Sequence, residues 1–398
     1  MMAAIRIRAL AGSCVLFASA CIDTPTSPPH PEPDAAPEVA LSSTAMPRFG
    51  DWISRRLEAG PWRMTEPWRA PGMWPILVGA GDIAECYDGA IPPSLEAARA
   101  QALTSPAAAT AALLDRIPGT VVALGDNAYE IGSPFDYAAC YEPTWGRHRE
   151  RTRPSAGNHE YMTPAAAGYF TYFLERSAPP LGYYSYNVGR WHVVVLNSTP
   201  QVYTCYPPEV TEVIRDPSWP APQLASEPTS AAAGRLCAGD VAQQAWLIRD
   251  LAAHSGYQCT VAYFHHPRFS SGSHGNHYQM QRIWDILYAF GVDVALTAHD
   301  HDYERFAPQD ANGRRDPAFG IRQFVVGTGG GSLRSVDARI RNSEVVITGE
   351  YGVLALGLGG TGYGWAFIST DRSVLDSGSD GCHGAPPRAT ILPFAPPA

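Results

Sequence analysis

His299 and His301 lie one residue apart, directly after an apolar, β-branched run at residues 292–297. Such a run predicts a buried strand. Side chains at the carboxyl end of a strand lie where α/β sheets bind their ligands. The pair therefore predicts a metal site, although a surface loop with two histidines is the alternative for this motif alone.

Four further units, each a strand followed by a polar loop, carry residues of the same chemical kind, which favours the metal site. The residues at these ends are Asp82; Asp126 with Tyr129; Asn158 with His159; and His265 with His266. A carboxylate has two oxygens that can bridge two metal ions, and Asp126 is the natural bridge because Asp82 and Tyr129 flank it. Carboxylate and phenolate oxygens suit ferric iron, whereas imidazole and amide ligands suit zinc, manganese or ferrous iron. The pattern predicts a ferric ion and a divalent ion in a pocket that attracts phosphate.

Strands and helices alternate along the part of the chain that carries these residues. Strands are expected at residues 76–81, 120–124, 183–187, 191–197, 259–264, 292–297, 322–326, 353–358 and 364–369. Helices are expected over residues 95–116, with a break near Pro106, from the N-cap Asp240 onward, and over 278–290. This order predicts an α/β fold with buried strands.

A glycine-rich run at residues 327–331 follows one of these strands. It lacks the Lys and Ser/Thr spacing of a nucleotide-binding loop, and no clear helix follows it. We therefore expect a tight backbone crossing beside the metal site.

The first 20 residues have the features of an export leader. A basic start precedes an apolar run too short to span a bilayer, and Ala20 ends a small-residue cleavage site. Because Cys21 follows, a lipid anchor to a membrane at Cys21 and ordinary cleavage both remain open. The expected location is periplasmic, on the cell surface as a lipoprotein, or secreted.

The remaining chain divides by composition. We expect a Pro-rich tether at 21–45, a Trp-rich lead-in at 46–74 that packs on the domain, a single main domain at 75–380 with an insertion at 199–238, and a tail at 381–398. The formal net charge is -9 and no basic block stands out, which argues against nucleic-acid binding by charge.

Six cysteines follow the leader region, and in an oxidising compartment they can form three disulfides. We expect Cys205 to pair with Cys237, because they bracket the insertion, and Cys86 to pair with Cys140, because both flank metal loops. A zinc–thiolate site is the alternative, but no CxxC motif supports it.

Taken in order, the motifs carry a family resemblance. They are Gly81-Asp82, Gly125-Asp126-x-x-Tyr129, Gly157-Asn158-His159-Glu160, Ala262-x-x-His265 and Ala298-His299-x-His301. This set resembles the five blocks of the calcineurin-like metallophosphoesterase superfamily, and Tyr129 resembles its purple acid phosphatase branch. The resemblance covers about residues 75–380. It implies a four-layer α/β/β/α sandwich, in which two packed mixed sheets are flanked by helices.

The resemblance also implies roles for individual residues. The first, ferric-type metal would be held by Asp82, Asp126, Tyr129 and His301, and the second by Asp126, Asn158, His265 and His299. His159 and His274 would contact the substrate phosphate, with His159 the candidate to protonate the leaving oxygen. For Tyr129, a core tyrosine with a satisfied hydroxyl is the alternative.

The implied function is an exported phosphoesterase that hydrolyses the phosphate monoester of a small substrate by attack of a metal-bound hydroxide. A phosphodiesterase acting on nucleotides or phospholipid head groups, and a non-catalytic surface protein that keeps the fold, are the alternatives.

The chain departs from the family pattern at a few positions. Gly275 stands where plant members often have a second histidine, and His277 is the candidate to replace it. Alternation along the strand would turn His266 away from the site. Glu85 is either an acceptor behind the ligands or a solvated side chain.

Overall fold

The computed structural model describes residues 49–62, 74–87, 92–203 and 240–386. The expected leader, the tether, most of the insertion and the Cys205–Cys237 pair lie outside these residues. Within the described ranges, no helix is both long and apolar enough to cross a membrane.

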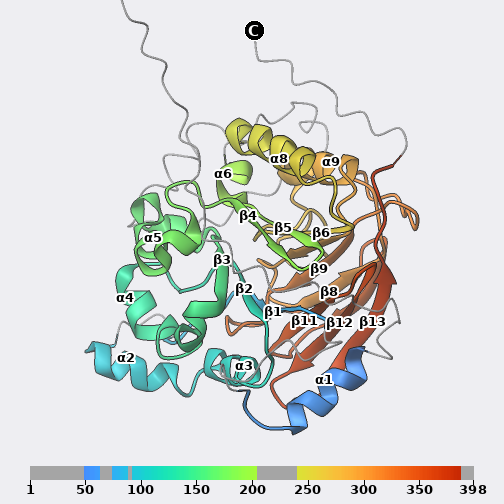
Figure 1. The fold of residues 1–398 in the computed structure, drawn as a ribbon. Coiled ribbons are helices and arrows are strands. Elements are labelled where there is room, and N and C mark those ends of the chain that lie inside the picture. The colour runs from blue at the N-terminus through green and yellow to red at the C-terminus, as the bar shows by residue number, and fades with distance from the viewer. Residues whose placement is uncertain (1–48, 63–73, 88–91, 204–239, 387–398) are drawn as a thin grey trace, which may run out of the picture. The chain divides into compact units, whose positions relative to one another are not determined.

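The first sheet has six strands and carries both parallel and antiparallel pairs (Figure 1). Its order is β13 (Val374–Gly381), β12 (Gly362–Ser369), β11 (Gly352–Leu358), β1 (Ile76–Ala80), β2 (Thr120–Leu124) and β3 (Thr152–Ser155). β1, β2 and β3 run parallel to one another, whereas β1 pairs antiparallel with β11. The carboxyl ends of β1, β2 and β3 therefore meet at one edge, and Asp82, Asp126 and Asn158 follow them.

The second sheet has seven strands and is also mixed. Its order is β10 (Ser343–Ile347), β8 (Tyr303–Phe306), β9 (Arg322–Val326), β7 (Val294–Thr297), β6 (Cys259–Tyr263), β5 (Trp191–Val195) and β4 (Tyr184–Val188). β5, β6, β7 and β9 form its parallel centre. His265 and His299 follow β6 and β7, so this sheet also presents its ligands at the carboxyl ends of parallel strands.

The sheets pack face to face because their strands are apolar on both faces. Val193 and Leu296 of the second sheet share one buried cluster with Val78 and Leu356 of the first. The alternate residues of the second sheet, such as Val194, join a separate cluster beneath the helices. Each sheet thus buries one face against the other sheet and has helices on its outer face, which confirms the expected sandwich.

Helices cover the outer faces. They are α1 (Phe49–Glu58), α2 (Leu95–Ala102), α3 (Pro106–Leu114), α4 (Pro134–Asp136), α5 (Ala167–Phe173), α6 (Ser198–Tyr203), α8 (Val241–Ala253) and α9 (Gln281–Ala289). α8 and α9 bury Leu247 and Trp284 against the second sheet, whereas α1 packs on β12 and β13 of the first (Figure 1). Asp240 caps α8 by accepting a hydrogen bond from the Gln243 backbone N–H, as expected.

Ion pairs join the two sheets at the edge strand β13. Asp376 of β13 accepts hydrogen bonds from Arg305 of β8, at 2.8 Å, and from the Tyr303 hydroxyl, at 2.7 Å. Asp380 accepts a 2.9 Å hydrogen bond from Arg322 of β9. These long-range contacts explain why β13, which is rich in Asp, Ser and Gly, was not expected as a strand.

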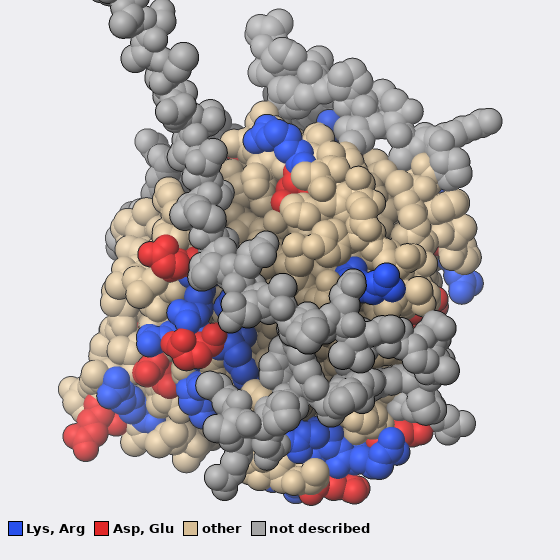
Figure 2. Space-filling model, in the orientation of Figure 1, with Lys and Arg blue, Asp and Glu red and all other residues tan. Residues whose placement is uncertain are grey.

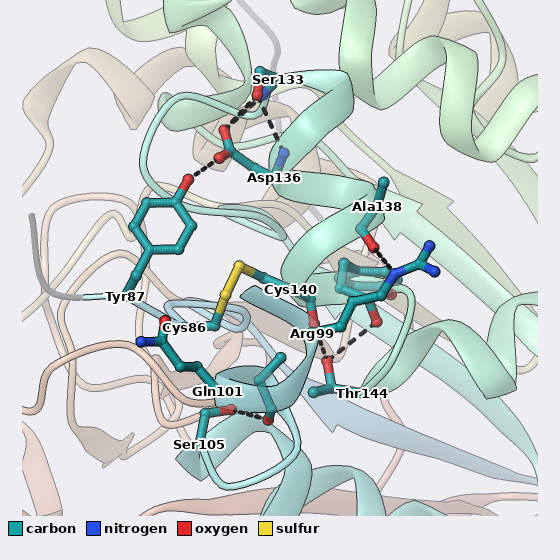
Figure 3. The surroundings of a disulfide bond; sticks show 12 residues. Cys86, Tyr87, Arg99, Gln101, Ser105, Ser133, Asp136, Ala138, Cys140 and Thr144 are labelled. Atoms are coloured by element: carbon teal, nitrogen blue, oxygen red, sulfur yellow. Dashed lines mark hydrogen bonds between the residues drawn. A yellow bond between two sulfur atoms is a disulfide. The ribbon is translucent and has the colours of Figure 1, made fainter. Parts of the chain in front are cut away.

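Two disulfides occur among the described residues. Cys86 is bonded to Cys140, as expected, and Cys259 is bonded to Cys382. Figure 3 shows that the first disulfide joins the loop after Asp82 to the segment around Cys140, where the Tyr87 hydroxyl also bonds Asp136. The four cysteines in these bonds are therefore not available as zinc ligands.

Charged side chains do not form one basic surface on the face seen in Figure 2. Basic and acidic side chains lie beside one another along its lower part. The described charges on this face are therefore mixed in sign.

The glycine-rich run makes the expected backbone crossing. The Gly329 N–H donates to the Gly81 carbonyl at 2.9 Å, and the Gly331 N–H donates to the Asp82 carbonyl at 2.7 Å. The loop after β9 of the second sheet thus lies directly on the loop after β1 of the first. A Cβ atom at Gly329 would lie 2.5 Å from the Gly81 carbonyl oxygen, so this approach requires glycine.

We expect Gly329→Ala to destabilise the fold by about 1–3 kcal/mol, because the methyl group must push two backbone segments apart. Gly360→Ala is the matched control, since a Cβ at Gly360 meets nothing within 4 Å, and its effect should stay within about 0.5 kcal/mol. The check is the urea unfolding midpoint of each variant. Equal midpoints would mean that the two loops are not held in close contact.

Candidate metal centre

Three of the proposed ligands leave their strands through left-handed backbone conformations. Asp82, Asp126 and His299 have φ angles of 55°, 47° and 71°. A non-glycine residue in this region costs of order 1–3 kcal/mol and persists only where the surrounding structure holds it, commonly at functional sites. The turn at each residue directs a polar side chain into the space between the two sheets' loops.

Asp82 connects the loops of the two sheets. Its side chain is fully buried, and its Oδ2 accepts a 2.8 Å hydrogen bond from the His299 backbone N–H. Ligands from the first sheet and ligands from the second are therefore held in fixed relation by a direct hydrogen bond.

The four residues expected around the first metal lie together. The Tyr129 hydroxyl is 2.8 Å from Asp82 Oδ1, 3.2 Å from His301 Nε2 and 3.4 Å from Asp126 Oδ2. Two ligand atoms that are each about 2.1 Å from one ion lie about 3.0–3.4 Å apart at ordinary coordination angles. The separations of 3.2 and 3.4 Å match such a set, whereas the 2.8 Å separation is that of a hydrogen bond from the Tyr129 hydroxyl to Asp82.

The residues expected around the second metal converge at the neighbouring position. His265 Nε2 lies 3.1 Å from Asp126 Oδ2 and 3.2 Å from His299 Nδ1. Asp126 Oδ2 thus faces both groups, whereas Asp126 Oδ1 accepts a 2.9 Å hydrogen bond from the His159 backbone N–H. Of its two oxygens, Oδ2 is thus the one directed at both positions, and the bridging role of Asp126 stays a prediction.

Asn158 provides a test of whether the residues fit a metal. Its side-chain Oδ1 is buried, and it has no hydrogen-bond partner among the described residues. An unsatisfied buried carbonyl costs about 1–3 kcal/mol, so native structures rarely leave one without a role. A cation at this position would satisfy the oxygen, and the donor set therefore fits the expected group.

Hydrogen bonds behind the ligands orient two of the imidazole rings. His265 Nδ1–H donates to the Leu124 carbonyl at 2.9 Å, and His301 Nδ1–H donates to the Ser332 carbonyl at 2.8 Å. In both residues Nε2 is then directed at the metal position, where it binds a metal after losing its proton, as is usual for metal-binding histidines. Ser332 is held in turn by Glu85, which accepts from its backbone N–H at 2.5 Å and its hydroxyl at 2.9 Å.

Glu160 holds the loops after β2 and β3, although no role was expected for it beyond its place in a motif. Its buried carboxylate accepts from the backbone N–H groups of Gly157 at 2.7 Å, Asn127 at 2.8 Å and Asp126 at 3.0 Å. These bonds fix the position of Asp126 from behind. The only hint in the sequence is that Glu160 directly follows Asn158 and His159.

The charges of the site show an excess of negative groups that histidines partly neutralise. Burial alone would raise the pKa of Asp82, but His301 and His265 outweigh it and hold that pKa below its usual value. Burial would lower the pKa of His265, but the carboxylate of Asp126 outweighs it and raises the pKa to about 9. Burial together with Asp82 and Asp126 raises the pKa of Tyr129 well above its usual value.

The two histidines expected to contact phosphate lie at the rim. The side chains of His159 and His274 are 19% and 24% exposed, whereas those of His265 and His301 are 0% and 7% exposed. The His159 ring lies 4.5 Å from the Tyr129 ring, and the His274 ring lies 4.1 Å from the His299 ring, measured between centroids. His159 thus adjoins the first metal position and His274 the second.

Two further histidines lie closer to the centre than the sequence suggested. The expectation that His266 points away is wrong, because β6 ends at Tyr263 and strand alternation no longer applies. The His266 ring lies 4.6 Å from that of His299, and its Nδ1 is 2.8 Å from the Ser198 hydroxyl. His277 is buried 5.0 Å from the His299 ring, with no hydrogen bond to either ring nitrogen among the described residues.

We expect Asn158→Ala and His265→Ala to lower the metal content of the purified protein, because each removes a proposed ligand of the second metal. His159→Ala is the matched control, since it removes the neighbouring rim side chain and leaves every proposed ligand in place. Metal content is measured by mass spectrometry after gel filtration. Two metals retained by Asn158→Ala and His265→Ala would remove the second site.

Metal binding should also depend on pH. Because the pKa of His265 is about 9 in the metal-free chain, this residue is protonated at pH 7 and must lose its proton to bind a metal. Affinity should therefore rise between pH 6 and pH 9, with proton release at pH 7. Calorimetry in two buffers of different ionisation enthalpy measures that release, and its absence would contradict the proposed role of His265.

Comparisons with known proteins agree with this geometry. The sequence profile of the calcineurin-like phosphoesterase family matches residues 104–303, half of the chain. Purple acid phosphatase 15 of Arabidopsis thaliana is 25% identical over 257 residues, which are 55% of this chain and 41% of that protein.

A solved structure is also similar. It is the purple acid phosphatase PPD1 from seeds of yellow lupin (Lupinus luteus), with 16% sequence identity and a TM-score of 0.51. The match covers 80% of this chain and 57% of that one, so the chain spans only about half of the length of these two relatives. At this identity the structural similarity supports the fold alone, whereas the sequence match shows the family: the chain belongs to the calcineurin-like phosphoesterases.

Proposed function

We propose that the chain is a metal-dependent phosphoesterase that hydrolyses phosphate monoesters of small substrates. The observation that carries this proposal is the buried, unpartnered Oδ1 of Asn158 beside converging ligands from both sheets. The family supports phosphoester chemistry, and the two relatives are named purple acid phosphatases, which supports the choice of monoesters.

Two bound metal ions supply a water of lowered pKa as the nucleophile and a positive charge for the phosphoryl oxygens. The chain's own residues do the rest. Asp126 Oδ2 faces both metal positions and sets their spacing, while His299 N–H holds Asp82 in place. His159 Nδ1 contacts the Glu130 carbonyl, which directs Nε2 into the site; there it can donate a proton to the leaving oxygen.

The environment of Tyr129 supports ferric iron as the first metal. The Tyr129 hydroxyl is already satisfied by Asp82, so the position fits both a core tyrosine and a metal ligand. Its pKa is raised by burial and by two carboxylates, and a phenolate therefore forms only beside a strong Lewis acid. A trivalent ion meets this requirement better than a divalent one, which leaves the zinc, manganese or ferrous ion for the second position.

The two disulfides support export, because such bonds persist in oxidising compartments. We propose that the protein acts outside the cytoplasm on a small phosphorylated substrate.

The first experiment is a metal analysis and a visible spectrum of the purified protein. We expect two metals per chain, one of them iron, and a tyrosinate-to-iron absorption band that disappears in Tyr129→Phe. Two metals without the absorption band would mean that Tyr129 is a core tyrosine and does not bind iron. No metal at all would favour a non-catalytic surface protein.

The same preparation is assayed with a chromogenic phosphate monoester and the matching diester. Faster turnover of the monoester supports the proposal. Faster turnover of the diester would make the protein a phosphodiesterase, and failure to hydrolyse either would contradict the proposed activity.

A further inference from the structure

Arg334 extends from the loop after the glycine-rich run to the rim of the metal centre. Its Nη1 lies 2.8 Å from His274 Nε2 and 3.4 Å from the Ser273 hydroxyl. The backbone of the same loop is fixed, because the Arg334 N–H donates to the His301 carbonyl at 3.1 Å and the Ser332 carbonyl accepts from His301. The exposed side chain of Arg334 thus belongs to a loop whose backbone is hydrogen-bonded to His301, a proposed metal ligand.

The hydrogen bonds of His274 define what each of its nitrogens can do. Its Nδ1 lies 3.0 Å from Asp300 Oδ1, which also accepts a 2.9 Å hydrogen bond from the His274 backbone N–H. Nδ1 therefore carries the proton that Asp300 accepts, because a carboxylate only accepts. Arg334 Nη1 lies 2.8 Å from Nε2 and 3.3 Å from Nδ1, and these two distances place it over the face of the ring. The charged donor presented beside His274 is therefore Arg334.

The Arg334 guanidinium has N–H donors that bond none of the described residues. Its hydrogen bonds with the described residues all use Nη1, and no carboxylate of these residues forms an ion pair with it. Arg305 and Arg322, by contrast, are each paired with two carboxylates. The Nε–H and one Nη2–H of Arg334 form a planar fork of charged donors, which can be directed at one charged oxygen of a phosphate group.

The ester class follows from this fork. A monoester dianion offers three non-bridging oxygens and carries two charges, whereas a diester offers two and carries one. When two oxygens of a diester face metal ions, none remains for Arg334, but a monoester keeps a third, charged oxygen for it.

We propose that Arg334 is an anion-binding residue of this site that selects the dianionic, terminal phosphate of monoesters, with His274 and Asp300 as the residues that position it. This inference rests on the proposed phosphoesterase function and names the part of the chain that sets its substrate class.

The test compares wild type, Arg334→Gln, Arg334→Lys and Arg339→Gln. Arg339 is the matched control, because it is an exposed arginine five residues away whose Nη1 bonds the Glu344 carbonyl and not His274. In Arg334→Gln we expect KM for the monoester and the inhibition constant of inorganic phosphate to rise about 10- to 100-fold, the usual range for a hydrogen bond between charged groups. Diester turnover should change less than about threefold, a limit set at a fraction of that range. Arg334→Lys should recover part of the loss, and Arg339→Gln should match wild type.

If Arg334 only supports His274, Arg334→Gln will lower kcat for both ester classes equally and leave phosphate inhibition unchanged, which overturns the proposal. Binding of inorganic phosphate to the metal-loaded protein, measured by calorimetry, separates this inference from the proposed function. A wild type that hydrolyses no ester contradicts the proposed function. Even then, loss of phosphate binding in Arg334→Gln supports the anion site, and unchanged binding removes it.

Discussion

The structure depends on the burial of two carboxylates between two sheets. Asp82 and Asp126 are 0% and 1% exposed, although an isolated ionised carboxylate in an apolar medium costs tens of kcal/mol by Born solvation. Backbone N–H groups of His299 and His159 and the imidazole of His265 offset part of this cost. The remaining negative charge raises the pKa of His265 and is what a metal ion would neutralise. The strained turns at both aspartates are then the local cost of directing them into one place.

Because the ligands come from both sheets, the centre exists only when the sheets are packed. The crossing of Gly329 over Gly81 and the ion pairs of Asp376 and Asp380 both hold that packing. A ligand that binds only the folded state stabilises it by RT ln(1 + [L]/Kd). Metal binding therefore stabilises the packing of the sheets, and a mutation that weakens the packing lowers the affinity for metal.

The sequence predicted the buried central strands and the edge strand β4, but not the edge strands β3, β10 and β13. Central strands such as β1 and β7 are fully buried, so an apolar run identifies them directly. Four of the five residues of β10 are half-buried and Glu344 is exposed, and β13 contains turn-forming residues held by arginines of distant strands, so neither is a fully buried apolar run.

The prediction of the candidate site was also limited to what a local sequence pattern shows. The proposed ligands could be named because each follows its strand within a few residues. Glu160 and Arg334 act through contacts across long stretches of chain, and the use of a single oxygen by Asp126 depends on a backbone N–H of His159. Periodicity contains no information on such contacts. His266 was misplaced for a related reason, because alternation was extended beyond the end of β6.

The charged residues of the site determine whether metal ions or phosphate bind first. Without metal ions, a phosphate dianion would meet Asp82, Asp126 and Asp300, and the chain as a whole carries a formal charge of -9. Arg334 alone contributes one positive charge at the rim, where solvent screens it. The buried carboxylates, in contrast, act at low dielectric, and protonated His265 balances only one of the two charges of Asp82 and Asp126. The remaining negative charge opposes the attraction of Arg334 until cations neutralise it. Metal binding must therefore precede phosphate binding, and Arg334 refines the choice of anion only after the metals have made the pocket positive.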